Sequence, residues 1–155
     1  MREEVDAVIR KHGKHYVAIH LRQLEGQCPK RVRRERVRIT REDLGREVTH
    51  EDICQVSDQY LAAALAKDRV PREWPIIILH DGQPLSVARV PQLIERFGAV
   101  DVRGTPLVAM LLLAKSSYLV GNPASTFSVN MADIRRASGA AEASTTLRYG
   151  HYWDP

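Results

Sequence analysis

Three short apolar segments do most to limit the folds that are open to this chain. They are Tyr16–Ile19, Ile76–Leu79 and Tyr118–Val120, and a weaker segment of the same kind spans Ala99–Val102. The three lack the polar–apolar alternation of a strand with one solvent-exposed face, so they are typical of parallel strands covered on both faces. Segments with helical spacing separate them. The sequence therefore predicts an α/β domain, a parallel sheet with helices on both faces and right-handed crossovers.

The helices are expected at Arg2–Lys11, His50–Ala66, Ser86–Phe97, Leu107–Ala114 and between Ser125 and Gly139. Thr49 is a suitable cap for the second helix, and Pro91 should kink the third or confine it to its second half. The fourth should begin with Thr105 as its cap and Pro106 at its first position, and it is apolar on every side, which predicts that it is buried. The last helix is expected to turn Phe127, Met131 and Ile134 towards the core.

The chain has the size and composition of one globular domain, with 155 residues, 44% hydrophobic and 27% charged. Its longest apolar run, Leu107–Ala114, has eight residues, whereas a membrane-spanning helix needs roughly 20. The charged N-terminus does not resemble a secretory signal. We expect a domain over residues 1–139, followed by a tail over residues 140–155 for which the sequence predicts no element.

The basic character of the chain is concentrated in one segment. Of the 23 basic and 19 acidic residues, eight basic and three acidic lie in Lys30–Arg46, which leaves fifteen basic and sixteen acidic elsewhere. This segment belongs to a long connection, Gln23–Thr49, without clear periodicity. Its charge fits a polyanion site or a solvated loop, and the lack of interleaved aromatic residues disfavours a single-strand nucleic-acid binder.

Cysteine usage leaves two alternatives open. Cys28 and Cys54 are too few for a zinc motif and do not form Cys-x-x-Cys. They either form one disulfide, in an oxidising compartment, or remain two buried thiols.

Polar residues suited to phosphate follow three of the predicted strands. His20 and Arg22 lie at the carboxyl end of the first strand, and Asp81 lies at the end of the second. Ser125 and Thr126 open the helix after the last strand. All carboxyl ends of a parallel sheet lie on one edge, so these residues can meet. A guanidinium opposite a helix N-terminus can clamp a diphosphate, and the carboxylate suits guanine N–H groups or a ribose hydroxyl.

Each of these residues also has a structural interpretation. Ser125 can simply cap its helix, and His20 can be a satisfied histidine at a strand end. Asp81 precedes a glycine, which is a common turn pair, and Phe127 falls at a core-facing helical position. Arg22 is the hardest to explain in this way, because a charged residue directly after an apolar strand needs a partner.

Two segments together resemble a known family. They are Tyr16–Arg22, with the sequence Tyr-Val-Ala-Ile-His-Leu-Arg, and Tyr118–Phe127, with the sequence Tyr-Leu-Val-Gly-Asn-Pro-Ala-Ser-Thr-Phe. They are similar to the GDP-fucose protein O-fucosyltransferases and their plant and algal relatives. In that family a strand ending in His-Leu-Arg and a later Gly-Asn-x-x-Ser-Ser/Thr-Phe turn surround the nucleotide sugar. The resemblance covers roughly residues 13–139 and implies a Rossmann-like domain, equivalent to the C-terminal half of a two-domain GT-B glycosyltransferase.

The resemblance implies a role for each matching residue. Arg22 would be the catalytic cation on the β-phosphate of GDP-fucose. Ser125 and Thr126 would hold the diphosphate, Phe127 would pack near the donor, and His20 would line the pocket. The implied reaction transfers fucose to an acceptor hydroxyl, with inversion and with neither metal nor other cofactor. Arginine and a helix N-terminus would then stabilise the leaving GDP.

The resemblance also implies partners and a compartment. GDP-fucose would be the donor, a protein or glycan would be the acceptor, and Asp81 would contact the base or ribose. Nucleic acid is not expected as a partner. Family members act in the lumen of the secretory pathway (endoplasmic reticulum and Golgi), although we expect neither a signal peptide nor a membrane anchor in this chain.

Two departures from the family pattern leave alternatives open. Relatives often carry an aspartate a few residues beyond His-Leu-Arg, whereas Glu25 is the only carboxylate near that position here. The family also has two such domains, and this sequence resembles only the second. A truncated or inactive relative that only binds GDP-sugar, or less readily a basic nucleic-acid-binding domain, would explain the same features.

Overall fold

A parallel sheet of five strands forms the centre of the computed structural model, which describes residues 2–23, 27, 28, 30, 49, 52, 54–122, 125–140, 145 and 146. The strand order is β3-β2-β1-β4-β5, and each neighbouring pair is parallel. The strands are β1 (Val17–Leu21), β2 (Ile76–His80), β3 (Val100–Asp101), β4 (Tyr118–Val120) and β5 (Thr145–Thr146). The predicted α/β class is confirmed. β5 lies in the segment for which the sequence predicted no element.

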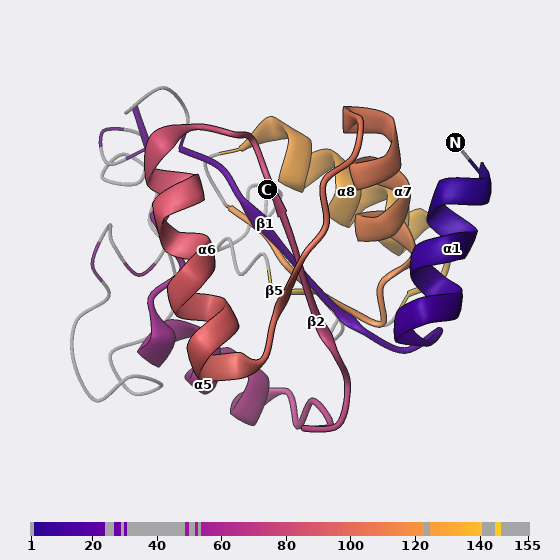
Figure 1. Cartoon of the computed structure of the whole chain (residues 1–155), viewed down its shortest axis with the longest axis horizontal. Helices are drawn as coiled ribbons and strands as arrows, with labels where there is room; N and C mark the ends of the chain where they lie inside the picture. Colours follow the sequence, from indigo (N-terminus) through magenta and orange to yellow (C-terminus); the bar gives the residue numbers. More distant parts are fainter. Residues whose placement is uncertain are drawn as a thin grey trace, which may run out of the picture.

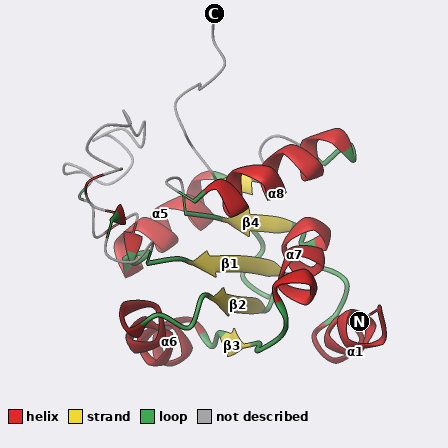
Figure 2. Ribbon diagram, turned by 90° about the horizontal axis from the view of Figure 1, so that it is seen from above, coloured by secondary structure: helices red, strands yellow, loops and turns green. Residues whose placement is uncertain are grey.

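Helices cover both faces of the sheet, which makes the fold Rossmann-like. They are α1 (Arg2–His12), α5 (Asp58–Lys67), α6 (Pro84–Phe97), α7 (Pro106–Lys115) and α8 (Thr126–Ala137). Figure 2 shows α5 and α6 on one side of the strands and α1 and α7 on the other. The N-termini of α6 and α8 both lie near the carboxyl ends of β1 and β2 (Figure 1).

Two apolar cores form because alternate side chains of each strand point to opposite faces. Val17, Ile19 and Leu21 pack with side chains of α5 and α6, whereas Tyr16 and Ala18 pack with those of α1, α7 and α8. All five residues of β1 are buried. This central position explains the unbroken apolar sequence, and each fully buried aliphatic side chain contributes roughly 1.5–3 kcal/mol.

The predicted helix at His50–Ala66 is not continuous, because Asp52 and Cys54 are helical but the helix is interrupted before α5 begins at Asp58. Thr49 does act as a cap, because its Oγ accepts a hydrogen bond from the N–H of Asp52 at 3.3 Å. However, Val56 has a left-handed backbone with φ 54°, which interrupts a right-handed helix. α5 then begins with its own cap, the Ser57 hydroxyl, which accepts from the N–H of Tyr60 at 3.2 Å.

Two expectations about α6 and α7 also need correction. Pro91 does not confine α6 to its second half, since the helix begins at Pro84 and Pro91 lies inside it. Pro91 is exposed, so the Val87 carbonyl that lacks its helical donor lies on the solvent side of the helix. α7 begins as predicted with the Thr105 cap, but it is not buried on every side, because Leu107 is 42% exposed.

The predicted orientation of α8 is wrong at its C-terminal half. Met131 is buried, but Ile134 is 42% exposed and Arg135 is only 2% exposed. The Arg135 guanidinium donates to the carbonyl oxygens of Ala114 at 3.3 Å and of Ser116. The last carbonyls of a helix have no partner within it, so Arg135 satisfies the end of α7. Gly139, with φ 80°, ends α8 as predicted.

Candidate functional site

The strand register brings Arg22 and Asp81 together. β1 and β2 pair from Val17 opposite Ile76 to Leu21 opposite His80, so the next residue of each strand lies at the same edge. The N–H of Asp81 donates to the Leu21 carbonyl at 3.3 Å. Arg22 Nη1 then donates to Oδ2 of Asp81 at 3.2 Å. The expected meeting of these two residues is confirmed.

Asp81 is a buried acceptor that organises this edge. Its side chain is 5% exposed, and it accepts the backbone N–H groups of Gln23 at 2.9 Å and Gln83 at 3.0 Å. Burial by itself would raise the pKa of the carboxyl group. The hydrogen bonds from Gln23, Gln83 and the Ser86 hydroxyl, together with the Arg22 charge, outweigh burial and hold the pKa below its usual value. Asp81 is therefore ionised at neutral pH, with both oxygens already bonded within the chain.

Gln23 is a site residue that the sequence analysis missed. Besides its N–H bond to Asp81, its side-chain Oε1 accepts the N–H of Leu85, in the first turn of α6, at 2.9 Å. Gln83, at the N-cap position, makes no side-chain cap bond. The N-terminus of α6 is thus capped from the end of β1, which joins the two elements at the site. A glutamine in a polar loop gives no sequence signal for such a role.

His20 lies beside this ion pair and is almost completely buried. It is 6% exposed, its Nδ1 lies 2.7 Å from Ser128 Oγ, and its ring packs on Phe127 with centroids 5.0 Å apart. Burial lowers the pKa of His20 to about 4, with the Asp81 charge opposing this shift and the Arg22 charge adding to it. His20 is consequently neutral at physiological pH.

Asn122 connects β1 with the start of α8. Its Nδ2 donates to the Arg22 carbonyl at 2.7 Å, its carbonyl accepts the N–H of Ser125 at 3.0 Å, and its N–H donates to Ser128 Oγ at 3.0 Å. Asn122 stands within the motif that carries the family resemblance. Ser128 was missed, although its spacing of three from Met131 places both on the inner face of α8.

The remaining predicted residues differ in accessibility. Ser125 is the N-cap residue of α8, but its hydroxyl makes no cap bond, and the residue is 1% exposed. Thr126 is exposed at the first helical position, and Phe127 is half-buried against His20. α8 therefore begins without a side-chain cap at the same edge as Arg22. A helix N-terminus carries a partial positive charge and free N–H groups, which suit an anion.

A disulfide links two segments that flank this edge. Cys28 and Cys54 are bonded, with their Cα atoms 5.9 Å apart, so the disulfide alternative is the correct one. Cys28 is buried, and its sulfur lies 3.5 Å from Nδ2 of Asn122. Most of the intervening Lys30–Arg46 segment lies outside the described residues, as does Glu25.

Two other kinds of feature are absent from the described part of the chain. No group of three or more His, Cys, Asp or Glu residues there could hold a metal ion. None of the helices described above is long and apolar enough to cross a membrane.

Comparison with known proteins shows the class of fold. No family model matches the sequence, and no curated protein matches it. Solved structures match over nearly the whole chain, and the shared fold is the Rossmann-like α/β domain that forms half of a GT-B fucosyltransferase.

Several of the matching structures are of POFUT1, GDP-fucose protein O-fucosyltransferase 1. The complex with GDP-fucose gives a TM-score of 0.61 at 18% identity, over 93% of this chain and 44% of that one. The complex with GDP gives 0.57 at 16% identity, over 96% and 47%. The apo form gives 0.56 at 16% identity, over 93% and 44%. This chain thus spans a little under half of those structures, and identity this low shows the fold alone.

Proposed function

We propose that this chain is the donor-binding half of a glycosyltransferase of the O-fucosyltransferase type, which transfers fucose from GDP-fucose to an acceptor hydroxyl. Support comes from the fold that it shares with structures solved with GDP-fucose and GDP. The acceptor would be a protein or a glycan. The domain would comprise residues 1–139, with residues 140–155 as a C-terminal tail that contributes one strand.

The observation that carries the proposal is the arrangement of Arg22. Asp81 fixes its guanidinium, while 30% of the Arg22 side chain remains exposed at the edge where α8 begins uncapped. The Arg22 carbonyl accepts a hydrogen bond from Nδ2 of Asn122, and the Asn122 carbonyl accepts the N–H of Ser125, so the backbone of Arg22 is tied to the N-terminus of α8. A diphosphate needs both features, because a guanidinium and helix N–H groups bind phosphate oxygens from different directions.

The chemistry follows from this arrangement. The acceptor hydroxyl loses its proton to water or to a base outside the described residues, its oxygen forms a bond to the anomeric carbon of fucose, and the bond from that carbon to the β-phosphate oxygen breaks, which inverts the anomeric centre. The leaving GDP gains negative charge in this step. Arg22 and the N-terminus of α8, with Ser125, Thr126 and Phe127 around the donor, would stabilise that charge without a metal ion.

The compartment and the remaining residues fit the same proposal. The Cys28–Cys54 disulfide favours an oxidising compartment such as the secretory lumen. His20 would line the donor site. Asp81 would act mainly by holding Arg22, since its oxygens are bonded within the chain, and a contact to base or ribose would be secondary.

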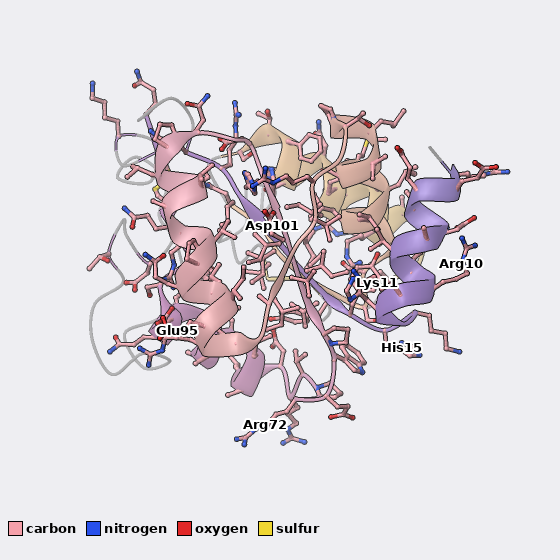
Figure 3. The ribbon with its side chains drawn as sticks, viewed as in Figure 1. Arg10, Lys11, His15, Arg72, Glu95 and Asp101 are labelled. Carbon is pink, nitrogen blue, oxygen red and sulfur yellow. A yellow bond between two sulfur atoms is a disulfide. The ribbon has the colours of Figure 1, made fainter. Side chains whose placement is uncertain are left out.

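Calorimetry with GDP and GDP-fucose tests the proposal. The folded chain should bind both, and Arg22→Ala should weaken GDP binding by roughly 10- to 100-fold, which is the usual strength of a charge-assisted hydrogen bond to phosphate. Arg72→Ala is the matched control, because Arg72 is exposed in the turn before β2, away from the site (Figure 3). A folded chain that does not bind GDP, or an Arg22→Ala variant that binds it equally well, would contradict the proposal.

A second candidate is a relative that binds GDP-sugar without transferring it. The observation that favours it is that the Asp81 carboxylate at this edge has both oxygens bonded within the chain, so it does not offer a base for an acceptor hydroxyl. Both candidates predict GDP binding. Release of GDP from GDP-fucose that depends on an acceptor would support the enzyme, whereas tight binding without turnover would support the binding protein.

A further inference from the structure

Two buried residues, Ser128 and Asn122, lie directly behind His20. Ser128 is 0% exposed and Asn122 is 1% exposed, so they can influence a ligand only through their neighbours. Ser128 Oγ lies between Nδ1 of His20, at 2.7 Å, and the backbone nitrogen of Asn122, at 3.0 Å. These two contacts determine which nitrogen of His20 carries the proton.

The Asn122 contact uses one acceptor position of the Ser128 hydroxyl, because a backbone N–H can only donate. The hydroxyl proton then needs an acceptor, and Nδ1 of His20 is in position for it. If Nδ1 carried the proton instead, the hydroxyl proton would have no acceptor among the described contacts of Ser128. Leaving a buried donor unsatisfied is unfavourable by more than a typical hydrogen bond contributes. The geometry therefore favours an unprotonated Nδ1 and a proton on Nε2.

Nε2 makes no hydrogen bond to any described residue. It is not a buried orphan either, because among the described residues the one buried polar side-chain atom without a hydrogen-bond partner is Oδ1 of Asp101. Phe127 packs on the ring with centroids 5.0 Å apart, and Ser128 holds Nδ1. The ring is thus fixed from two sides by α8, with its second nitrogen left for another partner.

We propose that Ser128, held by the backbone N–H of Asn122, is a positioning residue that fixes His20 as the neutral Nε2–H tautomer and so presents a hydrogen-bond donor to a phosphate oxygen. The identity of the ligand rests on the proposed function, whereas the tautomer does not. Asn122 also holds the Arg22 carbonyl. One buried residue therefore orients both the charged donor, Arg22, and the neutral donor, His20.

The neutral state of His20 follows from the groups that face it. Asp81 and Arg22 act on the ring with opposite signs, the two α8 side chains in contact with it do not titrate, and burial dominates. The contribution of His20 to binding should therefore not increase as the pH falls from about 8 to about 5.5, unlike that of a histidine with an ordinary pKa near 6.5.

NMR of the uniformly ¹⁵N-labelled chain tests the proposal without any ligand. Long-range ¹H–¹⁵N correlation distinguishes the two tautomers, and the His20 signals among the six histidines are identified by their loss in His20→Gln. We expect a protonated Nε2 and an unprotonated Nδ1 from about pH 5.5 to about pH 8. A protonated Nδ1, or titration near pH 6.5, would overturn the proposal whether or not the Ser128 variants fold.

Variants at Ser128 separate positioning from packing. Ser128→Ala should shift His20 towards a mixture of tautomers and weaken GDP binding roughly threefold to tenfold, the usual effect of one hydrogen bond. Ser128→Thr keeps the hydroxyl and should restore the wild-type tautomer, and Ser138→Ala, at an exposed serine beyond α8, is the control. An unchanged tautomer in Ser128→Ala would contradict the proposal. Failure of the wild-type chain to bind GDP would contradict the proposed function instead.

Discussion

Two arginines at opposite ends of the parallel strands have different roles. We call the side where the strands begin the amino edge and the side where they end the carboxyl edge. Arg135 lies at the amino edge, is 2% exposed, and donates to backbone carbonyls at the end of α7. Arg22 lies at the carboxyl edge, pairs with Asp81, and keeps 30% of its side chain exposed. A guanidinium whose neighbours are uncharged carbonyls completes the fold. A guanidinium held in place by a carboxylate, with 30% of its side chain exposed, would suit the anion site proposed above.

The amino edge is closed by a second buried polar group. The Tyr16 hydroxyl donates to the Leu112 carbonyl at 2.7 Å, and Arg135 donates to the carbonyls of Ala114 and Ser116. Burial raises the pKa of Tyr16 to about 12, against the smaller effect of Arg135. At the carboxyl edge polar groups instead contact two side chains, Arg22 and His20. Stability and binding should therefore be separable by mutation.

The largest effect is expected from Arg135→Met, which keeps most of the apolar stem and removes the charged head. The carbonyls of Ala114 and Ser116 would lose buried donors, so the free energy of unfolding should fall by about 3–5 kcal/mol. Urea denaturation measures it. Arg136→Met is the control, because Arg136 is 67% exposed and should change stability by less than about 0.5 kcal/mol. Similar losses in both variants would mean that the bonds from Arg135 to these carbonyls add nothing to stability.

The second largest effect is expected from removal of the disulfide. Cys28 and Cys54 are separated by 26 positions, and closure of a loop of this size stabilises a fold by about 3 kcal/mol. The double variant to alanine should lose about this much in urea denaturation. It should also weaken GDP binding, since Cys28 supports Asn122 at the carboxyl edge, whereas Arg135→Met, measured where it remains folded, should not. Equal GDP affinity in the wild type and the double variant would limit the disulfide to stability.

The sequence predicted the parts of this comparison that depend on local pattern. β1 and β4 lie where their apolar runs predicted, and the Thr105 cap and the Gly139 stop depend on residues within one turn of the helix end. Arg22 was identified because a charge directly after a buried strand needs a partner. The predicted roles of the site residues in binding GDP-fucose stay predictions until binding is measured.

The missed features depend on contacts between distant parts of the chain. Arg135 was missed because a hydrophobicity pattern assigns arginine to the surface, and its burial depends on carbonyls about twenty positions earlier in the sequence. Gln23 caps a helix 62 positions away, and no local signal marks such a bond. The two strand-forming threonines of β5 were missed because a strand of two residues has no measurable period.

A smaller effect is expected from Arg22→Ala on stability, in contrast to its effect on GDP binding. Asp81 would keep the N–H groups of Gln23 and Gln83, so the free energy of unfolding should fall by no more than about 1 kcal/mol. Urea denaturation and GDP calorimetry on the same sample measure both quantities. A stability loss as large as that of Arg135→Met would show that Arg22 completes the fold as well, and would break the comparison.

The smallest effect is expected from the titration of Asp81. Arg22 pairs with this carboxylate, whereas Arg135 donates to backbone carbonyls, so only the arrangement around Arg22 should depend on pH in the acid range. The pKa of Asp81 is lower in the folded chain than its ordinary value, so its ionised form contributes stability that is present above about pH 4 and is lost as the pH falls through the folded-state pKa. Asp81→Asn should therefore lose less stability than the wild type between about pH 5 and about pH 3.

Asp133→Asn is the control for this titration, because Asp133 pairs with Arg136 on the surface of α8 and is 51% exposed. That variant should follow the wild-type pH dependence closely. Parallel stability curves for the wild type and Asp81→Asn would mean that the Asp81 carboxylate gains nothing from Arg22 and the backbone N–H groups around it. In that case Arg22 would be held at the carboxyl edge by the backbone and Asn122 rather than by charge, and its exposed guanidinium would be less rigid than a diphosphate clamp requires.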